Sequence, residues 1–434
     1  MRKMKDSGIE WIKLIPWSWN VKRGKAILSL QKRSPEQYGP DDVITCFRDG
    51  EVTLRRKRRE EGFTFSDKEI GYQGIHRGDL VIHGMDGFAG SIGISDSDGK
   101  ASPVLVVCDS KENKRFLMYY LRMLATQNVF LALATGIRER SCDLRWNKVA
   151  ELLFPIPPQD EQCRIVDYLD SKCAKIDSII AKQEQIIEKL KEYKLSLITE
   201  AVTKGLDPNV EMKDSVVEWI GEIPAEWCLC RVKNLYQKVK NPVKVGPFGS
   251  QLTTSDYVSE GVWVYNQRVV LDKEFSENDT FISEEKYEEM KGFAVEEGDV
   301  LITTRGTGTT GHVVKVPKKY YKGILHPCLM RIKLDEDKCL FEFLYYVFEY
   351  GSYIRKQIDF ANNTSSLPVL YSYTLNNLSF ALPSISEQHR IVNQLDIYVK
   401  RVDRSILQKK ALIDQLKEYK KSLIYEVVTG KKEV

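Results

Sequence analysis

The side chains of this sequence that are best suited to binding chemistry are basic and amide residues, and they gather in short runs. The most compact run is Arg55-Arg56-Lys57-Arg58-Arg59. A row of cations can neutralise phosphate groups, which is how proteins hold a nucleic-acid backbone. The same run also fits a solvated basic face of a folded domain. Both interpretations stay open for this segment.

Further candidates mix arginine with amide and hydroxyl side chains. Arginine suits phosphates and guanine edges, whereas Asn and Gln suit adenine edges. In the first half of the chain the candidates are Arg138, Arg140 and Arg145, with Ser141 and Asn147 interleaved. In the second half they are Asn266, Gln267, Arg268, Arg305, Thr307, Thr309, Thr310, Asn362 and Asn363, the last two opening a polar run to Ser366. Pairing rules without docking geometry do not convert these residues into a recognised base sequence.

The sequence contains no pattern that indicates catalysis. Asn241-Pro242-Val243-Lys244 departs from the Asn-Pro-Pro-aromatic motif of methyltransferases, and no Walker-type loop or nuclease-like cluster of carboxylates and lysine occurs. Gly306-x-Gly308-x-x-Gly311 matches a dinucleotide-binding fingerprint, but that fingerprint must open a helix, and residues 312–317 have the pattern of a strand. The five histidines have no ligand spacing relative to the cysteines. We expect no catalytic residue, no metal and no cofactor in this chain.

Composition indicates an ordinary folded protein of two to four domains. The chain has 434 residues, 42% of them hydrophobic and 29% charged, with a formal net charge of +4. That mild excess of positive charge permits binding of nucleic acid without arguing strongly for it. No apolar run reaches the roughly 18 residues of a membrane span. Nine cysteines without a CxxC motif indicate free thiols in a reducing compartment, so we expect a cytoplasmic protein and no membrane contact.

The chain contains two copies of one frame. Met4-Lys5-Asp6-Ser7 returns as Met212-Lys213-Asp214-Ser215, and Trp19 returns as Trp227. Towards the end of each copy, Glu161-Gln162 returns as Glu387-Gln388, a shift of 226 residues. The stretches between these matched ends have little resemblance, apart from a Gly-Asp strand entry followed by spaced glycines. Such a long period indicates a tandem domain duplication.

A long helix closes each copy. Apolar residues recur at alternating steps of four and three, which is typical of a coiled-coil seam. The seam positions are Leu169, Cys173, Ile176, Ile180, Gln183, Ile187, Leu190, Lys194, Leu197 and Ala201, and their counterparts are Leu395, Val399, Val402, Ile406, Lys409, Ile413, Leu416, Lys420, Leu423 and Val427. Asp160 and Ser386 are the expected N-caps, and Gly205 and Gly430 mark the expected ends. A helix from about 160 to 204 is roughly 65 Å long, so antiparallel pairing of the two helices is the simplest arrangement.

A second apolar line runs beside this seam. It comprises Ile179, Ile186 and Tyr193, with Leu412 and Tyr419 at matching places in the second copy. This line widens the apolar stripe beyond what a two-helix seam requires. We expect it to bind a partner protein, although a helix pair that serves as a spacer between two domains is the plainer alternative.

With these features in hand, the chain resembles the specificity subunits of type I restriction-modification systems. The resemblance covers essentially the whole chain. It rests on the two-copy plan and on the segments Pro155-Ile156-Pro157-Pro158, Glu161-Gln162-x-x-Ile165, Leu382-Pro383, Glu387-Gln388-x-x-Ile391 and Gly246-Pro247-Phe248-Gly249-Ser250. Two departures stand out: Ser384-Ile385 replaces the expected second proline, and the first variable region lacks a Gly-Pro-Phe-Gly segment.

The resemblance implies an α/β (α+β) fold and a non-catalytic role. Each variable region would be a target-recognition domain of mixed strands followed by a long helix, and the helices would pair as an antiparallel coiled coil with pseudo-twofold symmetry. The implied segments are residues 1–158 and 206–384 for the two recognition domains, and residues 159–205 and 385–434 for the two helices. Each recognition domain would bind one half of an asymmetric, bipartite site in double-stranded DNA.

The resemblance also implies partners. Modification subunits would bring S-adenosylmethionine and methylate adenine, and a restriction subunit would use ATP and Mg for translocation and cleavage. A standalone nuclease or methyltransferase would need an acidic metal site or a methyl-donor motif, and neither is visible in the sequence. A purely structural coiled-coil adaptor would leave the two divergent glycine-rich domains without a role.

Overall fold

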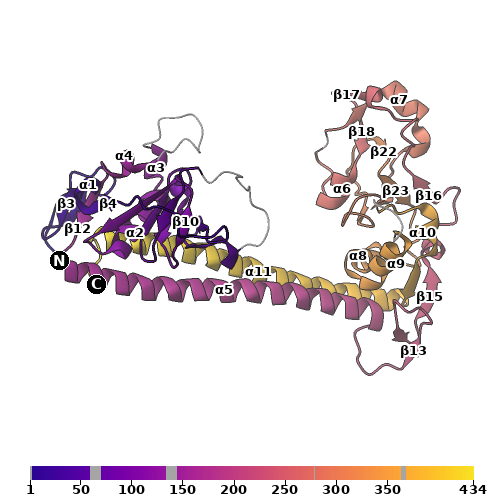
Figure 1. Cartoon of the computed structure of the whole chain (residues 1–434). Coiled ribbons are helices and arrows are strands. Elements are labelled where there is room, and N and C mark those ends of the chain that lie inside the picture. Colours follow the sequence, from indigo (N-terminus) through magenta and orange to yellow (C-terminus); the bar gives the residue numbers. More distant parts are fainter. Residues whose placement is uncertain (1, 59–69, 133–143, 278, 363–367) are drawn as a thin grey trace. The chain divides into compact units, whose positions relative to one another are not determined.

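The computed structural model describes residues 2–58, 70–132, 144–277, 279–362 and 368–434. The chain forms two compact units (Figure 1). Unit 1 comprises Met1–Gln185 with Lys409–Val434, and unit 2 comprises Ile186–Gln408. Both long helices are therefore shared, because unit 1 takes the first part of one and the last part of the other. The assignment of residues 1–158 and 206–384 as recognition domains stays a prediction.

The elements of unit 1 alternate short strands with short helices before the first long helix. In chain order they are β1 (Met4–Asp6), β2 (Leu14–Pro16), β3 (Asn20–Arg23), α1 (Gly24–Ile27), β4 (Leu28–Leu30), β5 (Ile44–Cys46), β6 (Val52–Leu54), η1 (Arg55–Lys57), β7 (Gln73–Ile75), β8 (Leu80–His83), η2 (Gly87–Ala89), β9 (Ile92–Ile94), β10 (Gly99–Ala101), β11 (Leu105–Ser110), α2 (Lys114–Thr126), α3 (Val129–Ala132), α4 (Trp146–Val149), β12 (Leu153–Ile156) and α5 (Gln159–Lys204).

The elements that follow α5 repeat this plan with additions. They are β13 (Met212–Asp214), β14 (Glu222–Pro224), β15 (Cys228–Arg231), η4 (Val232–Leu235), β16 (Val243–Val245), η5 (Thr254–Asp256), β17 (Tyr257–Val258), β18 (Val262–Tyr265), α6 (Gln267–Asp272), β19 (Phe281–Ile282), α7 (Glu284–Glu289), η6 (Lys291–Phe293), β20 (Val300–Thr303), β21 (Val313–Lys315), β22 (Gly323–Leu325), β23 (Leu329–Ile332), α8 (Phe341–Tyr350), α9 (Ser352–Asn362), α10 (Ser372–Asn377), β24 (Ser379–Leu382) and α11 (Ile385–Val428).

Each unit is built on a four-stranded antiparallel sheet with the same strand order. The order is β4-β11-β8-β9 in unit 1 and β16-β23-β20-β21 in unit 2. The strands outside this frame differ. Unit 1 adds the two-stranded pairs β5-β6 and β7-β10, whereas unit 2 adds a second four-stranded sheet, β17-β19-β18-β22. The duplication therefore preserved the frame, and the segments inserted into it diverged.

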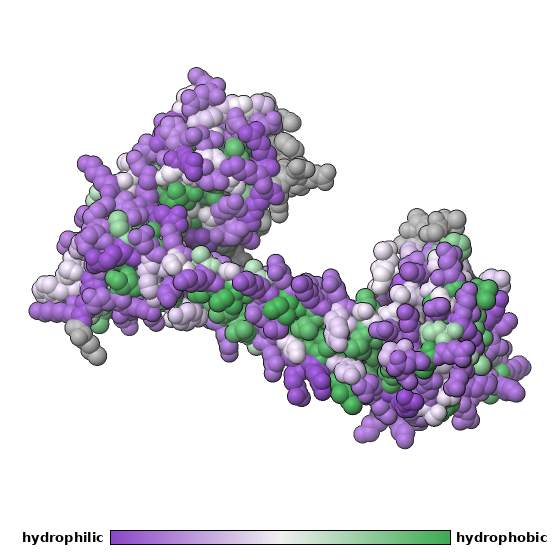
Figure 2. All heavy atoms as spheres, turned by 90° about the horizontal axis from the view of Figure 1, so that it is seen from below, coloured by the Kyte–Doolittle hydropathy of each residue, from purple (hydrophilic) through white to green (hydrophobic). Residues whose placement is uncertain are grey.

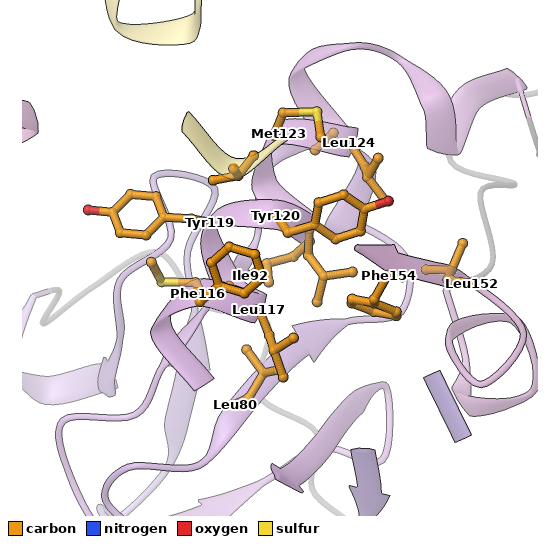
Figure 3. Close-up of a cluster of buried hydrophobic side chains, with 14 of the residues drawn as sticks. Leu80, Ile92, Phe116, Leu117, Tyr119, Tyr120, Met123, Leu124, Leu152 and Phe154 are labelled. Carbon is orange, nitrogen blue, oxygen red and sulfur yellow. The ribbon is translucent and has the colours of Figure 1, made fainter. Parts of the chain in front are cut away.

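A helix packed on the frame sheet forms the main core of unit 1. Helix α2 starts at Asn113, whose side chain accepts hydrogen bonds from the N–H groups of Arg115 and Phe116, as an N-cap should. Figure 3 shows side chains of α2 packed near Leu80 of β8 and Ile92 of β9. Helix α8 has the equivalent place in unit 2, where Phe343 is fully buried.

The repeated Trp, Glu and Gln residues join each frame to a long helix. The indole Nε1–H of Trp19 donates to Glu161 at 3.1 Å, and that of Trp227 donates to Glu387 at 2.9 Å. The neighbouring Gln162 and Gln388 are fully buried, and their Oε1 atoms accept N–H groups just before α2 and α8, both at 2.8 Å. A buried amide must be hydrogen-bonded to be tolerated, so these residues fix the angle at which each domain meets its helix. The need for these hydrogen bonds explains why the Trp, Glu and Gln residues recur in both copies.

The long helices pair antiparallel within each unit, as the sequence predicts. Every predicted seam residue is buried or half-buried. In unit 1, Lys420 forms an ion pair with Asp177 at 2.7 Å, and the amide oxygen of Gln183 accepts from Lys409 at 3.0 Å. In unit 2, the equivalent ion pair joins Lys194 and Asp403 at 2.8 Å. The polar seam positions therefore have partners across the helix pair, which pins its register.

The predicted N-caps are wrong by two residues. Helix α5 begins at Gln159 and α11 at Ile385, so Asp160 and Ser386 lie inside the first turn. The first hydrogen bonds of the two helices run to the carbonyl oxygens of Pro158 and Ser384, and the Ser384 hydroxyl accepts the N–H of Glu387 at 3.3 Å. A proline suits the entry to a helix because its missing N–H is not needed there. The predicted ends hold, since Gly205 and Gly430 both have the positive φ that favours glycine.

Candidate nucleic-acid interface

The second-half candidates come together around one loop of unit 2. This loop, residues 304–311, joins β20 to β21. The amide nitrogen of Gln267, at the start of α6, donates to the carbonyl oxygen of Arg305 at 2.5 Å, and the Thr309 hydroxyl donates to the same oxygen at 3.1 Å. Asn266 caps α6 by accepting the N–H of Arg268 at 2.9 Å. The structure thus places two separate sequence segments side by side, with Arg305, Thr307 and Arg268 exposed to solvent.

The loop is held in a defined shape. Gly306 has φ +109°, and a Cβ on it would lie 2.3 Å from the Thr309 hydroxyl, so no larger residue fits. The Thr303 hydroxyl donates to Thr309 O at 2.5 Å, and Arg355 of α9 donates to Thr310 O at 2.5 Å. A strand follows the loop, as expected, and excludes the dinucleotide-binding fingerprint. A preformed loop with outward polar side chains suits recognition of a rigid ligand.

A half-buried ion pair supports the base of loop 304–311. His312 Nδ1 lies 2.9 Å from Glu349 Oε2, and Glu349 also accepts the N–H of Val313 at 2.9 Å. The hydrogen bond to Glu349 raises the pKa of His312. Burial opposes ionisation of Glu349, but the hydrogen bonds from His312 and Val313 outweigh it and lower the pKa of this carboxyl group. Neither residue was a sequence candidate, because their positions in the chain do not reveal that they meet.

His326 is a second residue that sequence reasoning missed. Its Nδ1 accepts the N–H of Cys328 at 3.1 Å, and the N–H of Thr304 donates to Cys328 O at 2.9 Å. Burial and the nearby Arg305 charge together lower the pKa of His326. The imidazole is therefore kept neutral next to Arg305. The strand entry Gly298-Asp299 was the available signal for this region, because it placed a loop directly after β20.

Unit 1 has an equivalent loop between β8 and β9. Leu144 N–H donates to Gly84 O at 2.8 Å, as Leu370 N–H donates to Thr304 O at 2.7 Å in unit 2. The candidate Arg145 follows directly, and its Cγ would lie 3.9 Å from a Cβ on Gly84. Arg48, which was not a candidate, pairs with Asp86 of this loop at 3.0 Å. Equivalent loops in the two units therefore carry different polar residues.

The basic run of unit 1 is largely paired with carboxylates. Arg56 pairs with Asp42 at 3.3 Å, Lys57 with Asp96 at 3.3 Å, and Arg58 with both Asp49 and Glu51 at 2.5 and 2.9 Å. Arg55 also has a side-chain partner, Thr45, at 3.4 Å. Paired surface charges attract phosphates less than free ones do, so the structure favours the solvated-face interpretation for residues 55–58.

The known proteins that resemble this chain come from type I restriction-modification systems. The family model described as "Type I restriction modification DNA specificity domain" matches residues 253–417. The chain is 25% identical to the type I restriction enzyme EcoBI specificity subunit of Escherichia coli over 79% of this chain and 72% of that protein. It is also 25% identical to a putative type I specificity subunit of Haemophilus influenzae, over 74% and 75%.

Two solved structures share the fold. One, titled "Structural basis underlying complex assembly and conformational transition of the type I R-M system", gives a TM-score of 0.71 at 15% identity and covers 96% of this chain and 99% of that one. The HsdS subunit from Thermoanaerobacter tengcongensis gives 0.54 at 16% identity, with coverage of 96% and 98%. Over most of its length the chain is similar to specificity subunits of type I restriction-modification systems, and residues 253–417 match their DNA specificity domain. Specificity subunits of these systems are non-catalytic.

Several predicted DNA-binding positions lie outside the described residues. They are Arg59, Arg138, Arg140 and Asn363. Asn362 is the last residue of α9, but its side chain is not among those described. Within the described ranges, no three His, Cys, Asp or Glu side chains gather as a metal site, and no helix is long and apolar enough to cross a membrane.

The predicted partner-binding line is exposed on the two long helices. The exposed fractions are 43% for Ile179, 37% for Ile186, 57% for Tyr193, 39% for Leu412 and 53% for Tyr419. Figure 2 shows apolar atoms along the helices on the face it presents. Large apolar side chains at seven-residue spacing outside a filled seam are typical of a surface that binds another protein. Their role in docking stays a prediction.

Proposed function

We propose that this specificity subunit binds an asymmetric, bipartite site in double-stranded DNA, with one half-site read by each unit. The observation that carries the proposal is the pair of equivalent loops on one repeated frame. In unit 2 the loop presents Arg305 and Thr307 beside Gln267, whereas in unit 1 it lies beside Arg145 and carries the Arg48–Asp86 pair. Equal frames with unlike polar side chains would recognise unlike base sequences.

The residues divide into two proposed roles. Arg305 and Thr307 are exposed and contact phosphates or base edges. Arg268 is also exposed, but it pairs with Asp279 at 3.4 Å and contributes less. Gln267, Asn266 and Thr309 each use at least one polar atom inside the protein, so they chiefly position the exposed residues. In unit 1, Arg145 has the equivalent position by its loop, and the paired residues 55–58 contribute less. Asn362, Asn363, Arg59, Arg138 and Arg140 remain DNA-binding candidates from the sequence.

The partners in the proposed complex supply its chemistry. Modification subunits dock on the exposed line of α5 and α11 and methylate adenine with S-adenosylmethionine. A restriction subunit adds translocation and cleavage driven by ATP and Mg. The specificity subunit contributes no reacting group; it brings the target base to the methyltransferase, and the helix pair sets the distance between the half-sites. Activity on chromosomal DNA places the complex in the cytoplasm.

A methylation map tests the proposal. Genomic DNA is sequenced for modified adenine in matched cells with and without this gene, each expressing the cognate modification subunit. We expect one motif with two unlike halves and a fixed gap to lose methylation when the gene is absent. If the complex co-purifies but the map does not change, and the complex also selects no sequence from random DNA, the proposal is wrong. A chain that neither assembles nor selects DNA would instead support a structural adaptor.

A further inference from the structure

The turn after β16 carries an exposed phenylalanine that belongs to none of the candidate sets. Strand β16 is an edge of the frame sheet in unit 2. Phe248, three residues beyond it, is 74% exposed. The Phe248 N–H donates to the side-chain oxygen of Gln251 at 3.0 Å, and the Gln251 N–H donates to Phe248 O at 2.8 Å. These two bonds fix the turn, so the aromatic ring is presented to solvent on an ordered backbone.

The base of this turn is locked against the candidate interface. Gly246 and Pro247 are buried, and a Cβ on Gly246 would lie 2.1 Å from His326 O. Gly246 N–H donates to Leu329 O at 2.8 Å. The same segment, residues 326–329, receives the N–H of Thr304 at the start of loop 304–311. The Phe248 turn and loop 304–311 are therefore both anchored on one short segment.

The chain leading into β16 is basic. Lys238 and Lys240 are exposed, and Lys244 is half-buried with its Nζ 4.1 Å from the centre of the Phe293 ring. Within the described ranges these three lysines form no ion pair, although the hydrogen bond from Lys338 and, to a smaller extent, the charge of Lys238 lower the pKa of Asp335. They differ in this respect from residues 56–58 of unit 1, each of which forms an ion pair. Lysines without an ion-pair partner of their own, near an exposed aromatic ring, attract a polyanion.

We propose that residues 238–251 form a further DNA-binding element of unit 2. Lys238 and Lys240 contact phosphates, and Phe248 makes apolar contact with base edges in the groove next to the bases read by loop 304–311. Aromatic and aliphatic side chains make such contacts with thymine methyl groups or as wedges between base steps. This inference rests on the proposed function, because it assumes that unit 2 binds DNA.

DNA fits the element better than a partner protein does. An exposed ring alone suits either ligand, but a protein-docking surface is depleted in lysine around its apolar centre. Here the Phe248 ring follows lysines that form no ion pair. Its turn is hydrogen-bonded to residues 326–329, the segment that also holds the start of the loop with the exposed Arg305. We therefore commit to DNA and treat protein binding as an outcome that overturns the inference.

The first experiment compares Phe248→Ala with the control Val216→Ala, which removes another exposed apolar side chain of unit 2. The full-length chain, with its modification subunit, selects duplexes from a pool with a random central segment. One selected duplex then serves as the probe. We expect Phe248→Ala to weaken binding to that duplex by about 5- to 20-fold, with the control near wild type, since losing one base-pair contact costs about that much. Unchanged affinity would overturn the inference.

The second experiment addresses the lysines. In the double variant Lys238→Ala, Lys240→Ala, the slope of log affinity against log salt should fall by about 2, as expected for two lost phosphate contacts. An unchanged slope would contradict the phosphate role.

The two proposals fail in different ways. A wild-type complex that selects no sequence contradicts the proposed function, and the inference with it. A wild-type complex that selects a site, with the Phe248 variant binding it equally well, contradicts the inference and leaves the function intact. Loss of the modification subunit from purified Phe248→Ala protein would assign the ring to a protein contact and overturn the inference.

Discussion

Asp79 and Asp299 do the same structural work in the two units. Each is almost fully buried directly before a central strand of the frame sheet. Asp79 accepts the N–H of His76 at 2.7 Å and pairs with Arg33, whereas Asp299 accepts the N–H of Glu296 at 2.8 Å and pairs with Arg331 at 3.1 Å. In each unit, one carboxylate thus accepts from a backbone N–H and from a guanidinium group. These hydrogen bonds of Asp79 and Asp299 explain why the Gly-Asp dipeptide occurs in both copies.

We predict that Asp299→Asn lowers the free energy of unfolding of unit 2 by about 3 kcal/mol, because it leaves the buried guanidinium of Arg331 without its counter-charge. Urea titration followed by tryptophan fluorescence measures the change. The control Glu284→Gln removes an exposed partner of Lys322 and should change stability by at most about 0.5 kcal/mol. Equal effects of the two substitutions would refute the buried-pair argument.

Residue types were easier to predict than residue partners. The basic run is visible in the sequence itself. Its neutralisation depends on Asp42 and Asp96, which the fold brings close from other segments of the chain. The same holds for His312 and Glu349, which meet only because α8 packs beside β21. Gln267 and Arg305 were both candidates, yet their contact followed from no local pattern. Periodicity does not encode such tertiary pairings.

At the scale of elements, loop 304–311 is supported by the ion pair of His312 and Glu349, whose charges depend on pH. The pair of His312 and Glu349 is most stabilising when His312 is protonated and Glu349 ionised. Since the folded-state pKa of His312 is raised above its ordinary value of 6.5, this stability is complete below pH 6.5 and is lost as pH rises through the raised value. Since the pKa of Glu349 is lowered from 4.5, its contribution is lost only at more acidic pH.

We therefore predict that unit 2 becomes less stable as pH rises from about 6.5, the ordinary pKa of histidine, through the raised pKa of His312. Hydrogen exchange in loop 304–311 should then accelerate beyond the intrinsic effect of pH. The variant His312→Gln should lack this component and have a flatter profile of thermal midpoint against pH. If wild type and variant lose stability in parallel over this range, the support does not titrate as described.

The long helices were the elements most open to prediction, because their seam repeats over many turns and both copies share it. Their starts were misplaced by two residues, because Pro158 precedes the first turn of α5 and Ser384 precedes that of α11. The frame sheets could not be predicted, since their strands pair across long separations and run for only three to six residues. The additional sheet of unit 2 had no distinctive signal in the sequence.

At the scale of the molecule, the exposed line on the helices predicts a docking defect that spares folding. Ile186→Glu places a charge on a surface that we expect a modification subunit to cover, so co-purification of that subunit should fall at least about 10-fold, equivalent to about 1.4 kcal/mol. The control Val216→Glu changes an exposed residue away from the helices. Normal assembly of the Ile186 variant, with the thermal midpoint unchanged, would exclude this residue from the interface.

The repeated frame also predicts modular specificity. Replacing the segment between η4 and α10 with that of another specificity subunit exchanges the frame sheet of unit 2 together with its inserts. The flanking pair of strands β15 and β24 and the hydrogen bond from Trp227 to Glu387 stay in place. We expect one half of the methylated motif to change while the other half and the gap stay constant, as a methylation map would record. Simultaneous change of both halves would contradict independent reading by the two units.

The contact between Gln183 and Lys409 has an evolutionary consequence. These residues are counterparts, 226 positions apart, and they are hydrogen-bonded to each other. A residue meets its own counterpart only at the midpoint of two equivalent antiparallel helices. Had a single-copy ancestor assembled as a homodimer, the amino acid at that midpoint would have had to tolerate an identical neighbour, and two lysines there would repel. In a fused chain the midpoint is under no such constraint, and its pair of Gln183 and Lys409 disfavours self-association of the copy that carries the lysine.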